Sequence, residues 1–116
     1  MSSALWPPQP SIANGETSLG TVSSGSATIN FASTNAVSLT VGANTTFTVT
    51  GGQTGGCYIL RIIQDGTGSW TYAWSSNVKF PSDVTPLPSG ANKIDMVFLY
   101  FNGTNYDCTF SGNYSG

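Results

Sequence analysis

Residues 36–50 read AVSLTVGANTTFTVT, and they set the expectation for the whole fold. Val37, Leu39 and Val41 alternate with small side chains, a period of two that indicates a strand with one buried face. The run TTFTVT repeats this alternation after residues 42–44 (GAN), whose composition is typical of a turn. The stretch therefore predicts two short strands joined by a turn.

The same pattern continues along the chain from residue 21. The runs CYILRIIQ (residues 57–64) and IDMVFLYF (residues 94–101) are apolar on both faces, which favours two central strands. Asn102-Gly103 between apolar runs is a strong hairpin signal. Since no window has helical periodicity, we expect an all-β domain, an antiparallel β-sandwich or jelly roll of seven to eight short strands. A partly closed barrel is the alternative.

The first twenty residues differ from the rest. The prolines of WPPQP fix backbone angles and lack N–H donors, so we expect an extended N-terminal arm over residues 1–20 and a β-sandwich domain over residues 21–116. Trp6 is suited to anchoring such an arm on a neighbouring subunit. A frayed terminus is the alternative. The anchoring residues would be Trp6, Pro7, Pro8, Gln9 and Pro10.

Charge is scarce in this sequence. Only 7% of the 116 residues are charged, three of them basic, and histidine is absent. The lack of histidine excludes the usual Ser-His-Asp and Cys-His catalysis and histidine metal sites, so we expect no enzyme, no cofactor and no metal. Three cations do not suit nucleic acid or an anionic membrane. A neutral Ser/Thr/Asn surface instead favours contacts with other protein subunits.

The compartment is indicated by what the N-terminal residues lack. MSSALWPPQP has neither a basic nor an apolar signal region, so we expect synthesis in a cytoplasm.

Cys57 and Cys108 are the two cysteines. We expect either two small buried residues in strands or a disulfide that closes a loop of roughly 50 residues.

Trp70, Tyr72 and Trp74 form an aromatic ladder at alternate positions of one strand. If the ladder faces outward, it offers a stacking platform for sugar rings. If it faces inward, it belongs to the core or to a subunit interface, and a small domain with few leucines needs such aromatic core residues. Both alternatives stay open at this point. The acidic residues, which lie mostly near turns, are expected to bond to their own backbone there.

From about residue 19 onward the chain contains five motifs in a distinctive order. They are Gly20-Thr21-Val22, NTTFTVTG (residues 44–51), QDGTG (64–68), TYAWSSNVKFP (71–81) and SGANKIDMVFLYFNGTNY (89–106). In this order of motifs the chain resembles a β-domain family of tailed-bacteriophage virion proteins. In the fourth motif, Phe80 stands where the family typically has a tryptophan.

This resemblance implies a non-enzymatic structural protein of the virion surface that works as a homotrimer. With the arm and the neutral surface, it favours a capsid decoration (cement) protein whose partner is the major capsid protein. The alternative is a tail-tip or tail-fibre module that recognises a host-surface glycan. The glycan would be read by the loops at residues 51–56 and 81–91.

Overall fold

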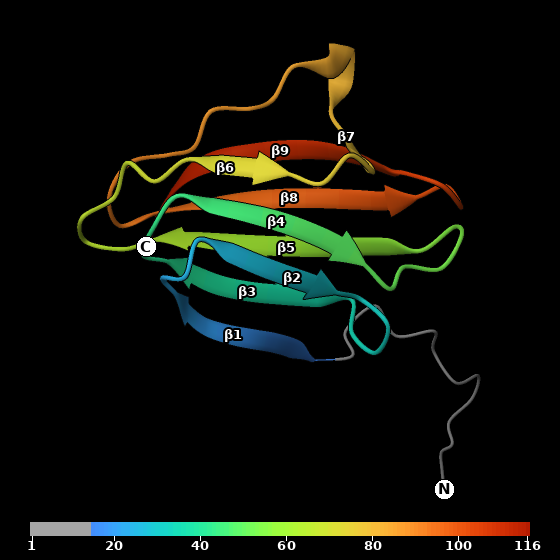
Figure 1. Cartoon of the computed structure of the whole chain (residues 1–116), viewed down its shortest axis with the longest axis horizontal. Helices are drawn as coiled ribbons and strands as arrows, with labels where there is room; N and C mark the ends of the chain where they lie inside the picture. Colours follow the sequence, from blue (N-terminus) through green and yellow to red (C-terminus); the bar gives the residue numbers. More distant parts are fainter. Residues whose placement is uncertain (1–14) are drawn as a thin grey trace, which may run out of the picture.

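The computed structural model describes residues 15–116, which form nine strands and one short 3₁₀ helix (Figure 1). The all-β prediction is confirmed, with more strands than the seven to eight expected. The elements are β1 (Glu16–Val22), β2 (Ser26–Asn30), β3 (Ala36–Val41), β4 (Thr45–Thr50), β5 (Cys57–Gln64), β6 (Tyr72–Trp74), β7 (Val78–Lys79), η1 (Pro81–Asp83), β8 (Lys93–Phe101) and β9 (Tyr106–Ser115).

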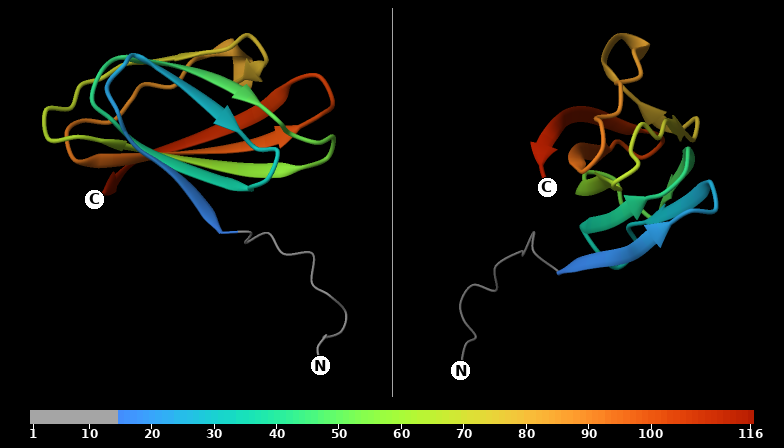
Figure 2. Two further views of the ribbon diagram at one scale, coloured as in Figure 1. Left: turned by 60° about the horizontal axis from the view of Figure 1, so that its bottom comes forward. Right: turned by 90° about the vertical axis from the view of Figure 1, so that its left-hand side faces the viewer.

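The strands form two layers, as predicted for a sandwich. A six-stranded sheet has the order β1-β3-β5-β8-β9-β7, and a three-stranded sheet has the order β2-β4-β6. Figures 1 and 2 show the smaller sheet lying over one face of the larger one. The strands β5 and β8, whose apolar residues occupy both faces, are neighbours in the middle of the larger sheet, as expected.

The expected antiparallel pairing holds for only part of the sandwich. Within residues 15–116, β5/β8 and β8/β9 are antiparallel, whereas β1/β3, β3/β5, β2/β4, β4/β6 and β7/β9 are parallel. Residues 42–44 do not fold the chain back within one sheet; they carry it from the larger sheet to the smaller one. Strands β1 to β6 therefore wind as a flattened coil, and the Gly42 N–H donates to the Val22 carbonyl of the preceding turn (2.9 Å).

The core lies between the two layers and follows the alternation in the sequence. In β4, Phe47 and Val49 are buried while the intervening threonines are exposed. They face Leu39, Leu60 and other apolar side chains of the larger sheet within one cluster. Each fully buried side chain of this kind contributes about 1.5–3 kcal/mol of transfer free energy, so the alternating faces supply most of the driving force for folding.

The larger sheet begins at Glu16, inside the region expected to be an arm. Its first strand pairs with β3 through Glu16 and Ala36, and nearly all its side chains are exposed. This edge strand is held by its backbone pairing with β3 and buries almost no side chain. Its sequence therefore lacks the hydrophobic alternation from which a strand can be predicted. Gly20, at a φ of 67°, lies within a register shift that kinks this edge. The anchoring residues 6–10 lie outside the described residues.

The loops gather at two ends of the sandwich (Figure 1). The end that holds loops 31–35, 51–56 and 102–105 also holds Gly15, whose carbonyl accepts a hydrogen bond from Thr34, and it is called the Gly15 end below. The opposite end, called the Trp70 end, holds loops 23–25, 42–44, 65–71 and 88–92. Each end carries a candidate binding site.

Candidate functional site

The aromatic ladder faces the core. Tyr72 is buried, and Trp70 and Trp74 are partly buried and lie against the core cluster. The Trp74 ring stacks on Phe47 with 4.8 Å between centroids. This arrangement corresponds to the core alternative, and an exposed three-ring platform for sugars is not formed. Trp70, which precedes β6, reaches the surface at the Trp70 end.

A chain of buried polar groups lies beneath the ladder. The side-chain amide of Gln64 donates to the Tyr72 hydroxyl and to the Trp70 carbonyl, each at 3.0 Å. The Tyr72 hydroxyl donates in turn to Asp95 Oδ2 at 2.6 Å. Asp95 also accepts hydrogen bonds from the Ser89 N–H (3.0 Å) and from the Ser89 hydroxyl (2.5 Å). These bonds attach loop 88–92 to the core.

Asp95 departs from the expectation that the acidic residues bond to their own backbone near turns. It is fully buried in β8, on the face that also carries Val97 and Leu99. The burial of Asp95 could have been predicted from the alternation of the sequence, since residues 95, 97 and 99 share a face of any strand. Burial, followed by the hydrogen bond to Asp95, raises the pKa of Tyr72 far above its usual value. The hydroxyl therefore stays a donor and the network is structural.

A shallow hollow of about 270 Å³ opens beside Trp70. The Trp70 indole N–H donates to Asp65 Oδ1 at 2.9 Å, which fixes the ring at the surface. Hydrogen bonds from the Gly68 N–H, the Trp70 indole and the Thr67 N–H lower the pKa of Asp65 and keep this acceptor charged. The hollow combines one indole with three hydroxyl side chains, since it is lined by Ser69, Trp70, Thr71, Pro88, Ser89 and Gly90.

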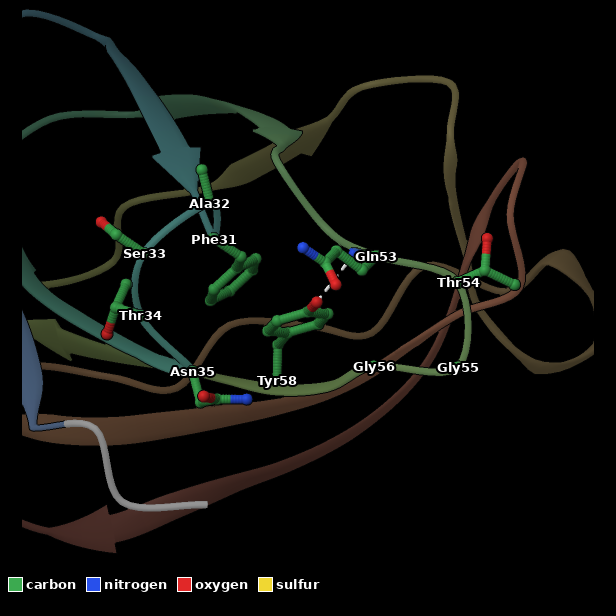
Figure 3. Close-up of a pocket in the computed structure, with 10 residues that line it drawn as sticks. All are labelled: Phe31, Ala32, Ser33, Thr34, Asn35, Gln53, Thr54, Gly55, Gly56 and Tyr58. Atoms are coloured by element: carbon green, nitrogen blue, oxygen red, sulfur yellow. Dashed lines mark hydrogen bonds between the residues drawn. The ribbon is translucent and has the colours of Figure 1, made fainter. Parts of the chain in front are cut away.

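A larger pocket, of about 450 Å³, lies at the Gly15 end between loops 31–35 and 51–56 (Figure 3). Its floor is the stacked pair of Phe31 and Tyr58, with ring centroids 4.6 Å apart. The Gln53 N–H donates to the Tyr58 hydroxyl at 2.8 Å, which fixes loop 51–56 against the ring. Its lining contains no charged side chain: Phe31, Ala32, Ser33, Thr34, Asn35, Gln53, Thr54, Gly55, Gly56 and Tyr58.

Both cysteines are free, so the disulfide alternative is wrong. Cys57 is exposed and Cys108 is buried. Cys57 pairs with Tyr100, which pairs with Asp107, so Cys57 and Asp107 share the outer face while Cys108 points to the core. The expectation of two buried residues holds for Cys108 alone. Burial raises the pKa of the Cys108 thiol to about 12, so it is unreactive near neutral pH.

The described part of the chain offers neither a metal site nor a membrane-spanning helix. Residues 15–116 contain no group of three or more His, Cys, Asp or Glu side chains that could hold a metal ion. Over the same range, no helix is long and apolar enough to span a membrane. The Trp70 hollow and the Gly15-end pocket are lined mainly by loop residues. Another pocket, of about 420 Å³, lies beside Trp74, Lys79 and Phe80.

Comparison with known proteins identifies the family. No curated protein and no solved structure matches the chain. The family described as "Putative phage tail fibre C-terminal domain" matches residues 20–106, three quarters of the 116 residues. The match runs from the last part of β1 through β8 to the first residue of β9, and it favours a tail fibre over capsid decoration as the setting. The chain belongs to this family of phage tail fibre C-terminal domains and is a structural component of the virion.

Proposed function

We propose that the chain is a non-enzymatic tail-fibre domain at the virion surface, which binds a neutral glycan of the host surface through the Trp70 hollow. The family match supports the tail-fibre setting. A neutral glycan suits this chain because its three basic residues offer little to an anionic ligand. Glycan rings are apolar on their faces and carry hydroxyls at their edges, so they require an aromatic ring beside hydrogen-bonding groups.

The observation that carries this proposal is the composition of the Trp70 hollow. The indole of Trp70 is partly exposed and is held in place by its bond to Asp65. Ser69 and Thr71 are exposed on either side of it, and Ser89 is half-buried at the opposite wall. The hollow lies at the end opposite to Gly15, so a ligand bound there does not compete with contacts at the Gly15 end.

Binding of the purified domain to host cells and to their neutral polysaccharides tests the proposal. We expect Trp70→Ala to remain folded by circular dichroism and to lose binding. Thr48→Ala, an exposed substitution in β4, is the matched control that should bind normally. A folded Trp70→Ala variant that still binds, or a native domain that binds neither cells nor polysaccharide, overturns the proposal. Labelling of phage heads rather than tails by an antibody to this chain would favour capsid decoration instead.

We further propose that copies of the chain associate as a homotrimer through the outer face of the larger sheet. The smaller sheet covers only the inner face of β5 and β8. On the outer face Ile59 lies directly opposite Phe98, and Tyr100 follows on the same strand. These side chains are 38%, 41% and 46% exposed respectively. Burial of this apolar stripe between subunits would remove it from water.

A further inference from the structure

The Gly15-end pocket lies beside the point where the described chain begins. Thr34, one of its lining residues, donates through its hydroxyl to the Gly15 carbonyl at 3.2 Å. The Ala36 carbonyl lies 2.9 Å from the same hydroxyl and shares its single proton, so Thr34 joins the first described residue to the start of β3. The chain that precedes Gly15 therefore starts from the margin of the pocket.

We propose that residues 6–10 (WPPQP) of the same chain bind in the Gly15-end pocket. This inference is independent of glycan binding, which is proposed for the opposite end of the sandwich. It gives the proline-rich segment a specific place on the domain, at the rim above the buried Phe31–Tyr58 pair.

The chemistry of the pocket suits a proline-rich segment. Phe31 and Tyr58 are 3% and 6% exposed, so their rings support the floor from below and a bound segment would contact mainly the polar rim. Prolines lack N–H groups but keep their carbonyls, so the pocket must mainly supply donors. The exposed side chains of Ser33, Gln53 and Thr54 supply a hydroxyl, an amide and a second hydroxyl at the rim. The Gln53 amide oxygen is also available to accept from the Trp6 indole.

Neither the pocket nor the proline-rich segment contains a charged side chain. The pocket lining contains no ionisable acid or base apart from the Tyr58 phenol. The first charged side chain of the sequence is Glu16, so the fifteen residues before it contain none. Neither partner would therefore leave a charged side chain buried without a counter-ion when the segment binds.

The length of chain available permits binding to the same domain. Five residue steps separate Pro10 from Gly15, and an extended chain covers about 17 Å over that distance. A tether this short gives the segment an effective concentration on the order of millimolar or higher, which favours its own domain over a second copy. The three prolines also lower the conformational entropy that the segment loses on binding.

Fluorine NMR of the full-length protein labelled with 5-fluorotryptophan tests this inference. Trp6→Phe assigns the Trp6 resonance among the three tryptophans. We expect the native Trp6 resonance to be shifted from the random-coil position and to show a small H₂O/D₂O solvent effect. Thr54→Arg, which fills the rim with a charged side chain, should return the resonance to the random-coil position. Thr67→Arg, an exposed threonine at the Trp70 end, is the matched control and should change nothing.

Three results of this experiment would overturn the inference. A native Trp6 resonance at the random-coil position, with a full solvent effect, would leave the pocket open for a second copy or a saccharide. A shifted resonance that Thr54→Arg does not alter would place Trp6 elsewhere on the protein. A shifted resonance that returns to the random-coil position on dilution would place the segment in the pocket of another copy, and this too contradicts the inference.

Discussion

The Tyr72 hydroxyl donates a 2.6 Å hydrogen bond to the Asp95 carboxylate and thereby joins the two layers of the sandwich. Tyr72 belongs to β6 of the smaller sheet and Asp95 to β8 of the larger one. Asp95 is fully buried, and its other hydrogen bonds come from Ser89. The pair thus fixes the spacing of the layers and the position of the loop that forms one wall of the Trp70 hollow.

A double-mutant cycle on this pair should show strong coupling. We expect Tyr72→Phe and Asp95→Asn each to lower the free energy of unfolding by about 1–3 kcal/mol, because each leaves a buried polar group with an imperfect partner. The double variant should cost less than the sum of the two, since both changes break the same bond. Urea denaturation of the four proteins measures this. Strictly additive costs would show that the hydrogen bond contributes nothing to stability.

The burial pattern of the strands could be predicted from the sequence, but their partners could not. Alternation within residues 36–50 correctly indicates that Val37, Leu39, Phe47 and Val49 are buried. It contains no information on which strand lies alongside. The turn at residues 42–44 has the composition of a hairpin, yet it carries the chain between sheets, because the hydrogen bonds that decide this come from residues of the preceding coil turn.

The candidate sites could be predicted only in part, for a related reason. Trp70 was singled out by its place in the aromatic ladder, and loop 51–56 as one of two loops expected to read a glycan. The Gly15-end pocket also depends on Phe31 and Tyr58, which are 27 residues apart and meet only because the coil stacks one turn on the next. No local motif encodes a contact of this kind. Asp95, in contrast, could have been placed in the core from alternation alone.

Stability should decrease in alkaline solution. Burial raises the pKa of Cys108 from 9.0 to about 12 and raises that of Tyr72 above 10.0. Since the unfolded chain loses these protons first, the contribution of these two groups to the free energy of unfolding should be constant below about pH 9 and then decrease as the pH rises. Each group contributes a slope of about 1.4 kcal/mol per pH unit above its unfolded pKa.

Urea denaturation across this pH range measures the slope. We expect Cys108→Ala to remove the part of the decrease that begins near the unfolded thiol pKa of 9.0. Tyr72→Phe should reduce the part that begins near 10.0 without abolishing it, because burial also raises the pKa of Tyr106. Cys57→Ala, at an exposed cysteine, is the matched control and should leave the profile unchanged. A native profile that stays flat through alkaline pH would contradict the burial of both groups.

Trp74 and Trp70 should respond differently to replacement by phenylalanine. The Trp74 indole N–H is buried without an acceptor among residues 15–116, so Trp74→Phe removes an unpaired polar group that costs about 1–3 kcal/mol. The stability gained by removing this unpaired N–H offsets much of the packing energy that is lost with the larger indole ring. Trp70→Phe instead breaks the bond to Asp65. Thermal denaturation should therefore rank Trp74→Phe above Trp70→Phe in stability, and the reverse order would mean that Trp74 has an acceptor.

The two thiols should differ in reactivity. In the native protein we expect one cysteine, Cys57, to react with a thiol reagent at neutral pH, and both to react in denaturant. Cys57→Ser should react only in denaturant, which identifies the protected thiol as Cys108. Treatment with a reductant should leave the unfolding transition unchanged. No reactive thiol in either state before reduction would indicate a disulfide and contradict the placement of the two residues on opposite faces.

Self-association should depend on the outer face of β5 and β8. The two-sided apolar pattern of these strands predicts burial on both faces, yet within the described chain only the inner face is covered, and Phe98 remains 41% exposed. We expect light scattering of the native protein to give three times the 12.1 kDa of one chain. Phe98→Glu should give a folded monomer, because it would bury a carboxylate against Ile59 of a neighbour or against another apolar side chain. Thr48→Glu, on the outer face of the smaller sheet, should leave the trimer intact. A native monomer, or a Phe98→Glu trimer, would show that the subunits meet elsewhere or not at all.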